Sequence, residues 1–376
     1  MRSPRIVGVG TTYHHCISRV VDRRIIFHAP EKEAFRSILR KLETFTGVRV
    51  ATYCLMGNHF HLLLEVPDRS LLPELDAEEL LAVLPLLYDK ASVETIAHEI
   101  TAARKAGDTL RENAILQRFE RRRGNLSIFL KELKQRVSIF MNKRLGRTGT
   151  LWEGRFKSLL VEGGESALLT VAAYIDLNPI RAKLVFKPED YRWSGYGEAN
   201  GAGKGAARAR QGLGSIQREA LENPGTFFDW KRTLDRYRVL LYMTGQEHPS
   251  DERHHPPSRP GISPAEVSKA TEQTTIPLPE LLRRKVRYFS DGAVLGSAAF
   301  VERSFEYLRE KGRIGPKRRT GARTPSGGDW GELRVLRDLR VRVYGPPPTR
   351  QNANARKASS APSFLSSPPE RLPRAP

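Results

Sequence analysis

Residues 56–66 read Met-Gly-Asn-His-Phe-His-Leu-Leu-Leu-Glu-Val and predict a β-strand behind a tight turn. The stretch alternates with the period of two that a strand imposes on its side chains. One face is entirely apolar, which predicts that it is buried in a core, and carries Phe60, Leu62, Leu64 and Val66. The opposite face carries His59, His61, Leu63 and Glu65.

His59 and His61 stand two residues apart on one face, so their rings can converge on a single cation. Neutral imidazole is a common ligand for borderline metals, and a rigid strand holds it well. A pair of histidines that binds nothing has the same spacing, because short motifs recur by accident. The motif alone therefore leaves both interpretations open.

The charge of the chain indicates a polyanionic partner. The 376 residues can bury a full core and leave room for two domains and a tail. They include 63 Lys and Arg against 42 Asp and Glu, a net charge of +21 at pH 7. The pI of about 10.2 favours nucleic-acid binding over a merely soluble basic protein, since such a field attracts phosphates.

The cysteines and the apolar runs of the sequence indicate the cellular compartment. Cys16 and Cys54 lie in apolar runs without CxxC spacing, which is typical of small core residues in a reducing environment. No apolar run approaches the roughly 18 to 20 residues that cross a bilayer, and the N-terminus leads into no signal-like core. The sequence predicts a cytoplasmic protein with no membrane partner.

The segments around the histidine strand predict an α+β fold. Residues 11–21 alternate and are rich in β-branched and aromatic side chains, as in a strand. Pro30 suits the first turn of a helix that Gly47 ends, and residues 48–56 form a second strand joined to the third by Gly57 and Asn58. Strand, helix, strand, strand predicts a ferredoxin-like or RRM-like antiparallel sheet with helices on one face.

The middle of the chain continues this pattern after an insertion. Residues 68–125 predict a helical insertion, and 126–145 predict a helix with one apolar face. A glycine-punctuated basic loop over 146–158 then precedes a short strand at 159–162. Its interleaved cations and Trp152 suit a DNA backbone with a base to stack on, although Trp152 fits a core position equally well.

A further helix begins at about residue 165 and contains Tyr174. It must end near Asn178, because Pro179 disfavours helical geometry before it. Taken alone, Tyr174 reads as a core residue with its hydroxyl at the surface. Asn178 lies one helical turn beyond it.

The sequence predicts a modular C-terminal part. Residues 201–226 read as a small-residue linker, 227–247 as a helix and 248–278 as a polar, proline-rich linker. Residues 279–345 read as a basic helical extension, with a helix over 279–289, a tight turn at 290–292 and a second helix capped by Ser297. This pattern is compatible with a helix-turn-helix and equally with an ordinary helical hairpin. Residues 346–376 are rich in Pro, Ser, Ala and Arg, which predicts disorder.

Four ordered blocks give the chain a family resemblance. They read TTYHHCISRVVDRRIIF, ATYCLMGNHFHLLLEVP, GTLWEGRFKSLLVE and AAYIDLNPIRAKLVFKPEDYRWSGYGEA, and they lie between residues 11 and 199. In this order they resemble the REP-associated tyrosine transposases, within the single-tyrosine HUH family. The resemblance implies a transposase domain over residues 1–200 that cleaves and rejoins single-stranded or hairpin DNA, as a monomer or a homodimer.

The resemblance also implies residue roles. His59 and His61 would bind Mg²⁺ or Mn²⁺, and Tyr174 would attack the phosphodiester. Asn178 would complete the metal sphere with a neutral oxygen, or hydrogen-bond backbone at the helix end. Relatives commonly have histidine where Asp176 stands, so this carboxylate would lie near the metal or alter a DNA contact. The side chains expected to contact DNA are Arg19, Arg147, Trp152, Arg155, Lys157 and Arg181.

Other functions stay open at this level. A DNA- or RNA-binding regulator that kept the fold would need no nucleophile, so the complete His59, His61 and Tyr174 set favours the enzyme. A replication initiator or relaxase of the same chemistry fits the surrounding blocks less well. Tyr191 and Tyr196 are the alternative nucleophiles to test.

Overall fold

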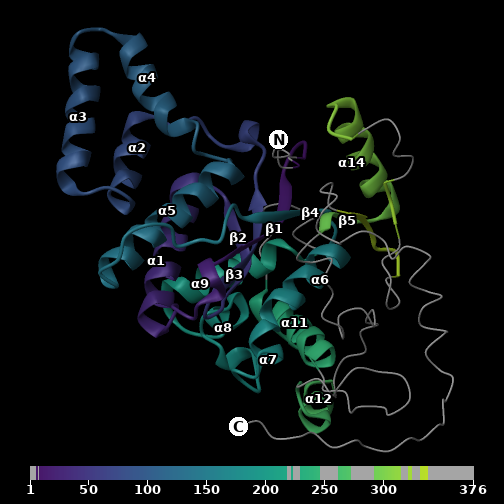
Figure 1. The fold of residues 1–376 in the computed structure, drawn as a ribbon. Helices are drawn as coiled ribbons and strands as arrows, with labels where there is room; N and C mark the ends of the chain where they lie inside the picture. Colours follow the sequence, from purple (N-terminus) through teal and green to yellow (C-terminus); the bar gives the residue numbers. More distant parts are fainter. Residues whose placement is uncertain are drawn as a thin grey trace, which may run out of the picture. The chain divides into compact units, whose positions relative to one another are not determined.

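A six-stranded sheet forms the centre of the structure, a computed structural model that describes residues 6, 8–217, 222, 229–245, 261–271, 292–314, 321–323 and 331–337 (Figure 1). The strands lie in the order β2-β3-β1-β4-β5-β6. Their bounds are β1 Thr12–Arg19, β2 Arg49–Leu55, β3 His59–Val66, β4 Lys157–Val161, β5 Gly292–Gly296 and β6 Arg334–Arg337.

The first four strands confirm the predicted ferredoxin-like sheet. Strand β1 lies between β3 and β4 and is antiparallel to both, and β2 is antiparallel to β3. The two helices that connect these strands are α1 (Ala29–Thr46) and α5 (Leu126–Arg144). Beyond β4 the sheet becomes mixed, because β5 is parallel to β4 and β6 is antiparallel to β5.

Helices α1 and α5 cover the face that the alternation of β3 predicted to be core. Phe60, Leu62 and Leu64 are fully buried there, in one cluster with Leu39 of α1 and Leu133 of α5. The ends of α1 follow the sequence signals closely. Pro30 lies in its first turn, and Gly47 closes it in the left-handed conformation at φ 70°.

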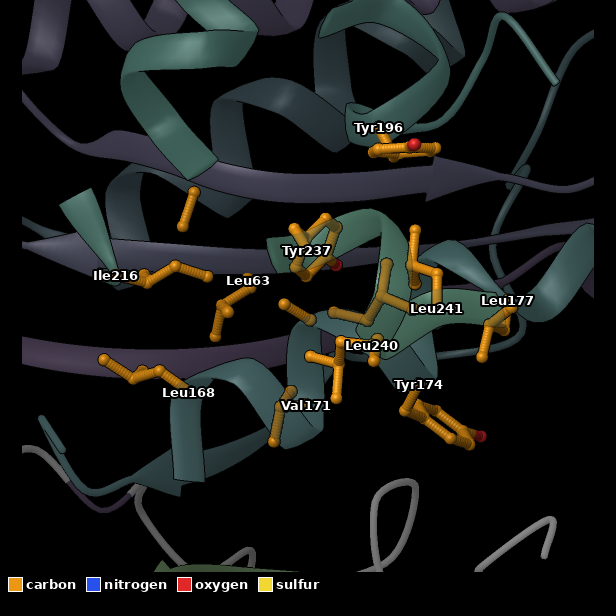
Figure 2. Close-up of a cluster of buried hydrophobic side chains, with 14 of the residues drawn as sticks. Leu63, Leu168, Val171, Tyr174, Leu177, Tyr196, Ile216, Tyr237, Leu240 and Leu241 are labelled. Atoms are coloured by element: carbon orange, nitrogen blue, oxygen red, sulfur yellow. The ribbon is translucent and has the colours of Figure 1, made fainter. Parts of the chain in front are cut away.

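Helices also cover the opposite face, so the prediction of helices on one face was incomplete. A second apolar cluster joins Leu63 of β3 to three helices, α6 (Glu165–Asp176), α9 (Gly203–Ser215) and α11 (Trp230–Gly245) (Figure 2). Two short helices, α7 (Asn178–Arg181) and α8 (Gly195–Ala199), connect α6 to α9. The sheet is therefore the middle layer of three.

The predicted linker over 201–226 was wrong for residues 203–215, which form α9. The small residues of α9 do not make this segment a flexible linker. They allow the helix to pack closely against β2. A Cβ added to Gly212 would lie 2.2 Å from the carbonyl oxygen of Val50, so only glycine fits. The next predicted linker, 248–278, contains one more helix, α12 (Pro264–Thr271).

The predicted helix-turn-helix is also corrected. Residues 292–296, expected to lead from a turn into a helix, form β5 and extend the sheet next to β4. Ser297 then caps α14 (Ala298–Glu310), as the sequence indicated. The first predicted helix, 279–289, and the predicted disordered tail, 346–376, lie outside the described residues.

The insertion after β3 is helical, as predicted. It contains α2 (Ala77–Val83), α3 (Lys90–Lys105) and α4 (Thr109–Glu120), which pack together around their own apolar cluster with Phe45 of α1 (Figure 1). Short 3₁₀ helices are η1 Val21–Arg23, η2 Arg69–Leu71, η3 Leu84–Leu86 and η4 Pro188–Asp190. No helix in the described part of the chain is long and apolar enough to span a membrane.

Candidate functional site

The register of β1 and β3 brings two histidines together. His15 lies opposite Leu63 and Ile17 lies opposite His61, so His15 and His61 are diagonal neighbours on one face of the sheet. Helix α6 packs against this face and contributes Tyr174 to the same apolar cluster as Leu63. The strand pairing thus places the site beneath one helix.

Tyr174 lies against both imidazoles. Its ring centroid is 5.8 Å from that of His61 and 5.9 Å from that of His15, with the rings edge to face. Only 3% of Tyr174 and 3% of His61 are exposed. Two distant segments of one chain therefore meet here without a second copy.

The tyrosine hydroxyl lies at the border of the core. Figure 2 shows Tyr174 at the edge of the apolar cluster, with its hydroxyl directed away from Val171 and Leu168. The guanidinium of Arg181 lies 5.1 Å from the centre of the Tyr174 ring and donates a hydrogen bond to the Tyr174 carbonyl oxygen at 3.0 Å. The positively charged side chain of Arg181 is therefore held beside the Tyr174 ring.

The predicted ligands His59 and His61 are neighbours at the edge of solvent. Their ring centroids are 5.1 Å apart and their planes meet at 76°. His59 is partly exposed, with Nδ1 2.7 Å from the side-chain oxygen of Asn58, whereas His61 is buried. The pair reaches from the core to the surface.

The environment of His61 favours its neutral form. Burial lowers the pKa of His61 well below its usual range, because the charged ring would lose its hydration. The positive charges of the surrounding groups lower that pKa further, namely those of His15, His59, Arg19 and Arg181. A neutral imidazole is the form that can ligate a cation.

Two imidazoles can hold part of a divalent cation's coordination sphere. Within the described ranges there is no group of three or more His, Cys, Asp and Glu side chains that could enclose a metal ion. An open pair of ligands suits a cation that keeps several positions for water or phosphate oxygens, as Mg²⁺ does. His59 and His61 therefore fit the implied cation as an incomplete shell.

Asn178 hydrogen-bonds backbone at the end of α6. Its side-chain amide donates to the carbonyl oxygens of Tyr174 at 2.9 Å and Ile175 at 3.1 Å. This is one of the two roles that the sequence left open. A contribution of its oxygen to a cation stays a prediction.

Asp176 has neither of its two expected roles, because it is fully buried in a hydrogen-bond network. Thr52 donates to its two oxygens at 3.0 and 2.9 Å, the Tyr237 hydroxyl donates at 2.7 Å, and the Tyr196 N–H donates at 3.1 Å. Burial raises the pKa of Asp176 to about 6, although these hydrogen bonds lower it. The carboxyl ties α6 to β2, α8 and α11.

Trp152 is a core residue, which contradicts its prediction as a DNA contact. It is 8% exposed and packs its ring against Phe27 and Phe60. Its indole N–H donates to the Lys134 carbonyl oxygen at 3.1 Å and to the Ser138 hydroxyl at 2.9 Å. A buried ring with its donor satisfied cannot stack on a base.

The cations of the 146–158 loop lie near the histidine strand. The Glu153 N–H donates to the carbonyl oxygen of Arg19 at 2.9 Å, and Arg19 pairs directly with His59. Arg19 and Arg155 are exposed, and Lys157 is partly buried opposite Ile17.

Arg147, also partly buried, donates to the Thr150 carbonyl oxygen within its own loop at 3.1 Å. The structure therefore brings Arg19 to the site and Arg155 to the same end of the sheet. The role of all these cations in DNA binding stays a prediction.

The alternative tyrosines are structural. The Tyr191 hydroxyl donates to the Leu55 carbonyl oxygen at 2.6 Å and accepts from Lys32 at 2.8 Å. Tyr196 is 1% exposed, with its ring 5.7 Å from that of Tyr237. The nucleophilic role of Tyr174 stays a prediction.

Sequence reasoning did not single out His15. The alternation of residues 11–21 separates it from His14, since consecutive side chains of a strand point to opposite faces. Which of the two faces His61 depends on the register between β1 and β3, which periodicity alone does not fix.

A ferredoxin-like sheet with a His-x-His pair near a tyrosine on a covering helix is the arrangement that the family resemblance led us to expect. Residues 9–75 match the family described as IS200-like transposases, which confirms the resemblance over this segment. The match supports a DNA-processing function of the transposase type.

Solved structures include a similar chain. It is described as a REP-associated tyrosine transposase bound to a REP hairpin, and it is 14% identical. The match covers 53% of this chain and 85% of that one, with a TM-score of 0.33. No curated protein sequence matches the chain.

Proposed function

We propose that the chain is a metal-dependent endonuclease and strand transferase in which Tyr174 attacks single-stranded DNA near a hairpin. The observation that carries the proposal is the 5.8 Å separation between the rings of Tyr174 and His61, within one chain. A core tyrosine needs no imidazole beside it, and a metal site needs no phenol. Their combination is what tyrosine-mediated phosphodiester cleavage requires.

The reaction conserves the energy of the broken bond. The Tyr174 oxygen loses its proton and bonds to phosphorus, the bond from phosphorus to the 3′ oxygen breaks, and that oxygen takes up a proton. The products are a 5′-phosphotyrosine and a free 3′ hydroxyl. A second 3′ hydroxyl can reverse the step and join strands without ATP.

The residues around Tyr174 would supply the positive charge that a phenol needs to act as a nucleophile. A phenol has a pKa of about 10, so the phenolate and the charge of the transition state both need stabilisation. His59 and His61 would hold Mg²⁺ or Mn²⁺, which supplies positive charge at the scissile phosphate. Arg181, 5.1 Å from the Tyr174 ring, would add a fixed positive charge next to the nucleophile.

A cationic surface beside His59 would hold the DNA backbone. Asn58 donates to the carbonyl oxygen of Arg23 at 2.7 Å, which fixes the loop after β1 against the turn before β3. Arg23 and Arg24 are exposed on that loop, and Arg19 is exposed next to it. Three cations beside the predicted ligands suit successive phosphates of one strand.

An exposed aromatic residue follows α7 and would replace Trp152 as the base-stacking side chain. Phe186 is 82% exposed, and Lys183 and Lys187 flank it in sequence. The segment begins at Arg181, which contacts Tyr174. Interleaved cations and an aromatic ring are typical of single-strand binding.

Cleavage of a labelled oligonucleotide tests the proposal. The substrate is a DNA hairpin with single-stranded flanks, incubated with Mg²⁺ or Mn²⁺ and, in parallel, with EDTA. We expect a covalent protein–DNA adduct on a denaturing gel with the intact chain, and none with Tyr174→Phe or with EDTA. Both proteins should bind the oligonucleotide equally well.

Tyr88→Phe is the matched control, because Tyr88 lies in the helical insertion, where its hydroxyl accepts from Arg122. It should form the adduct at the normal rate. An adduct that persists in Tyr174→Phe would refute Tyr174 as the nucleophile. Tight binding by the intact chain without any adduct would instead support a non-catalytic DNA- or RNA-binding regulator.

A further inference from the structure

A hydrogen bond joins the ring of His15 to that of His61 beneath Tyr174. His15 Nε2 lies 3.0 Å from His61 Nδ1, and the rings stack at 20° with centroids 5.2 Å apart. Only 1% of His15 and 3% of His61 are exposed. A hydrogen bond between two imidazole nitrogens needs one donor and one acceptor, so one of these two nitrogens carries a proton and the other does not.

The location of that proton decides what His61 can do. If His61 donates from Nδ1, its Nε2 carries a lone pair and can ligate a cation. If His15 donates instead, His61 carries its proton on Nε2 and cannot. A neutral imidazole has one donor nitrogen and one acceptor nitrogen, so no other arrangement satisfies this bond.

We infer that His15 is a positioning residue: its Nε2 accepts the Nδ1 proton of His61 and so holds His61 in the tautomer whose Nε2 faces the cation shared with His59. The inference rests on the proposed function for the cation. It deepens that function by naming the group that orients the ligand. Partners of this kind commonly fix ring orientation and tautomer in metal sites.

The ring contacts add an orienting role. The His15 ring meets the Tyr174 ring at 72° with centroids 5.9 Å apart, and the His61 ring meets it at 80°. His15 is therefore packed against both the ligand and the tyrosine. A much smaller side chain would release both rings at once.

The first test reads the tautomer directly in the metal-free full-length chain. Imidazole ¹⁵N shifts of histidine-labelled protein should show His61 protonated at Nδ1 in the intact chain. In His15→Leu, which has similar bulk and no acceptor, the proton should move to Nε2. His61 protonated at Nε2 in the intact chain would overturn the inference.

The second test measures Mn²⁺ affinity by calorimetry. His15→Leu should bind Mn²⁺ about 10- to 100-fold more weakly, the usual loss for such partners. His15→Gln should stay within about threefold of the intact chain, because the glutamine amide can accept a hydrogen bond at a similar reach. His14→Gln, on the other face of the sheet, is the matched control.

The outcomes separate this inference from the proposed function. Equal Mn²⁺ affinity in His15→Leu and the intact chain would overturn the inference, as would a loss of similar size in His15→Gln with its folding intact by circular dichroism. Failure of the intact chain to bind Mn²⁺ would count against the metal-dependent function instead. The ¹⁵N shifts would still decide whether His15 sets the tautomer of His61.

Discussion

His14 and His15 are consecutive residues of β1 that the sheet places in opposite environments. His15 lies on the face of α6, bonded to His61 and packed against Tyr174. His14 lies between Leu64 and Leu160 on the other face, with Nε2 3.1 Å from the Thr12 hydroxyl. One residue along a strand thus separates a histidine with chemical neighbours from one in a largely apolar setting.

The same contrast holds for the two faces as a whole. The face under α1 and α5 is built from side chains such as Phe60, Leu62 and Leu64. The face under α6 contains the His15–His61 pair and the buried carboxyl of Asp176. A face that holds polar groups in fixed positions needs hydrogen bonds to brace them, because an unpaired buried polar group is costly.

The largest expected effect is on catalysis. His61→Ala should slow formation of the covalent adduct roughly 10³-fold, because it removes a proposed ligand of the cation that would stabilise the transition state. His14→Ala should change the rate by less than about threefold, since that side chain lies on the other face. Single-turnover cleavage measures both. Equal losses of cleavage rate in His61→Ala and His14→Ala would contradict the distinction between the two faces of the sheet.

Substitution of Asp176 tests whether its buried hydrogen bonds stabilise the face of the sheet under α6. Asp176→Ala leaves the buried hydroxyls of Thr52 and Tyr237 without their acceptor, so the free energy of unfolding should fall by about 3 kcal/mol or more. Urea denaturation measures this loss. Asp176→Asn, which keeps one acceptor oxygen, should lose less. Unchanged stability in Asp176→Ala would mean that the network is dispensable.

His14 makes the core face sensitive to acid. Burial lowers the pKa of His14 from 6.5 to about 4, so its contribution to stability is complete above pH 6.5 and is lost as the pH falls toward 4. Between pH 7.5 and pH 5 this should destabilise the protein by about 2 kcal/mol.

Urea denaturation at the two pH values measures the total change in stability, to which the lowered pKa of His61 and the raised pKa of Asp176 also contribute. The difference between the intact chain and His14→Leu isolates the contribution of His14, whereas His98→Gln, at an exposed position of α3, should behave like the intact chain. If His14→Leu is as acid-sensitive as the intact chain, His14 does not titrate as its burial requires.

Substitutions of two aromatic residues should affect different properties, DNA affinity for Phe186 and stability for Trp152. Phe186→Ala should weaken binding of a single-stranded oligonucleotide by about 1 to 2 kcal/mol, because it removes a stacking surface, and should leave stability unchanged. Trp152→Ala should destabilise the core and leave the affinity of the folded protein unchanged. Fluorescence anisotropy and urea denaturation measure the two effects. The opposite pattern would restore Trp152 as the DNA contact.

The sequence was sufficient wherever local chemistry decides the structure. Pro30 and Gly47 gave the ends of α1, the alternation of residues 60–66 gave the core face, and the order of elements gave the antiparallel sheet. It failed where a distant partner decides. Gly212 looked like a linker residue because the backbone of Val50, which it packs against, is remote in sequence.

The site shows the same division. His59, His61 and Tyr174 could be named from their motifs, and the structure places them together. Asp176 and Trp152 could not be placed, because their roles depend on Tyr237 and on Phe60 as packing partners. A motif names candidate groups, and the packing decides which of them face the site.

The most direct measurement of the central claim is the identity of the residue that becomes bonded to DNA. The covalent adduct formed with a hairpin oligonucleotide and Mn²⁺ is digested with protease and nuclease, and the modified peptide is sequenced by mass spectrometry. The account predicts a nucleotide phosphate on Tyr174, in the peptide that contains Asp176 and Asn178. A phosphate on any other residue would contradict it.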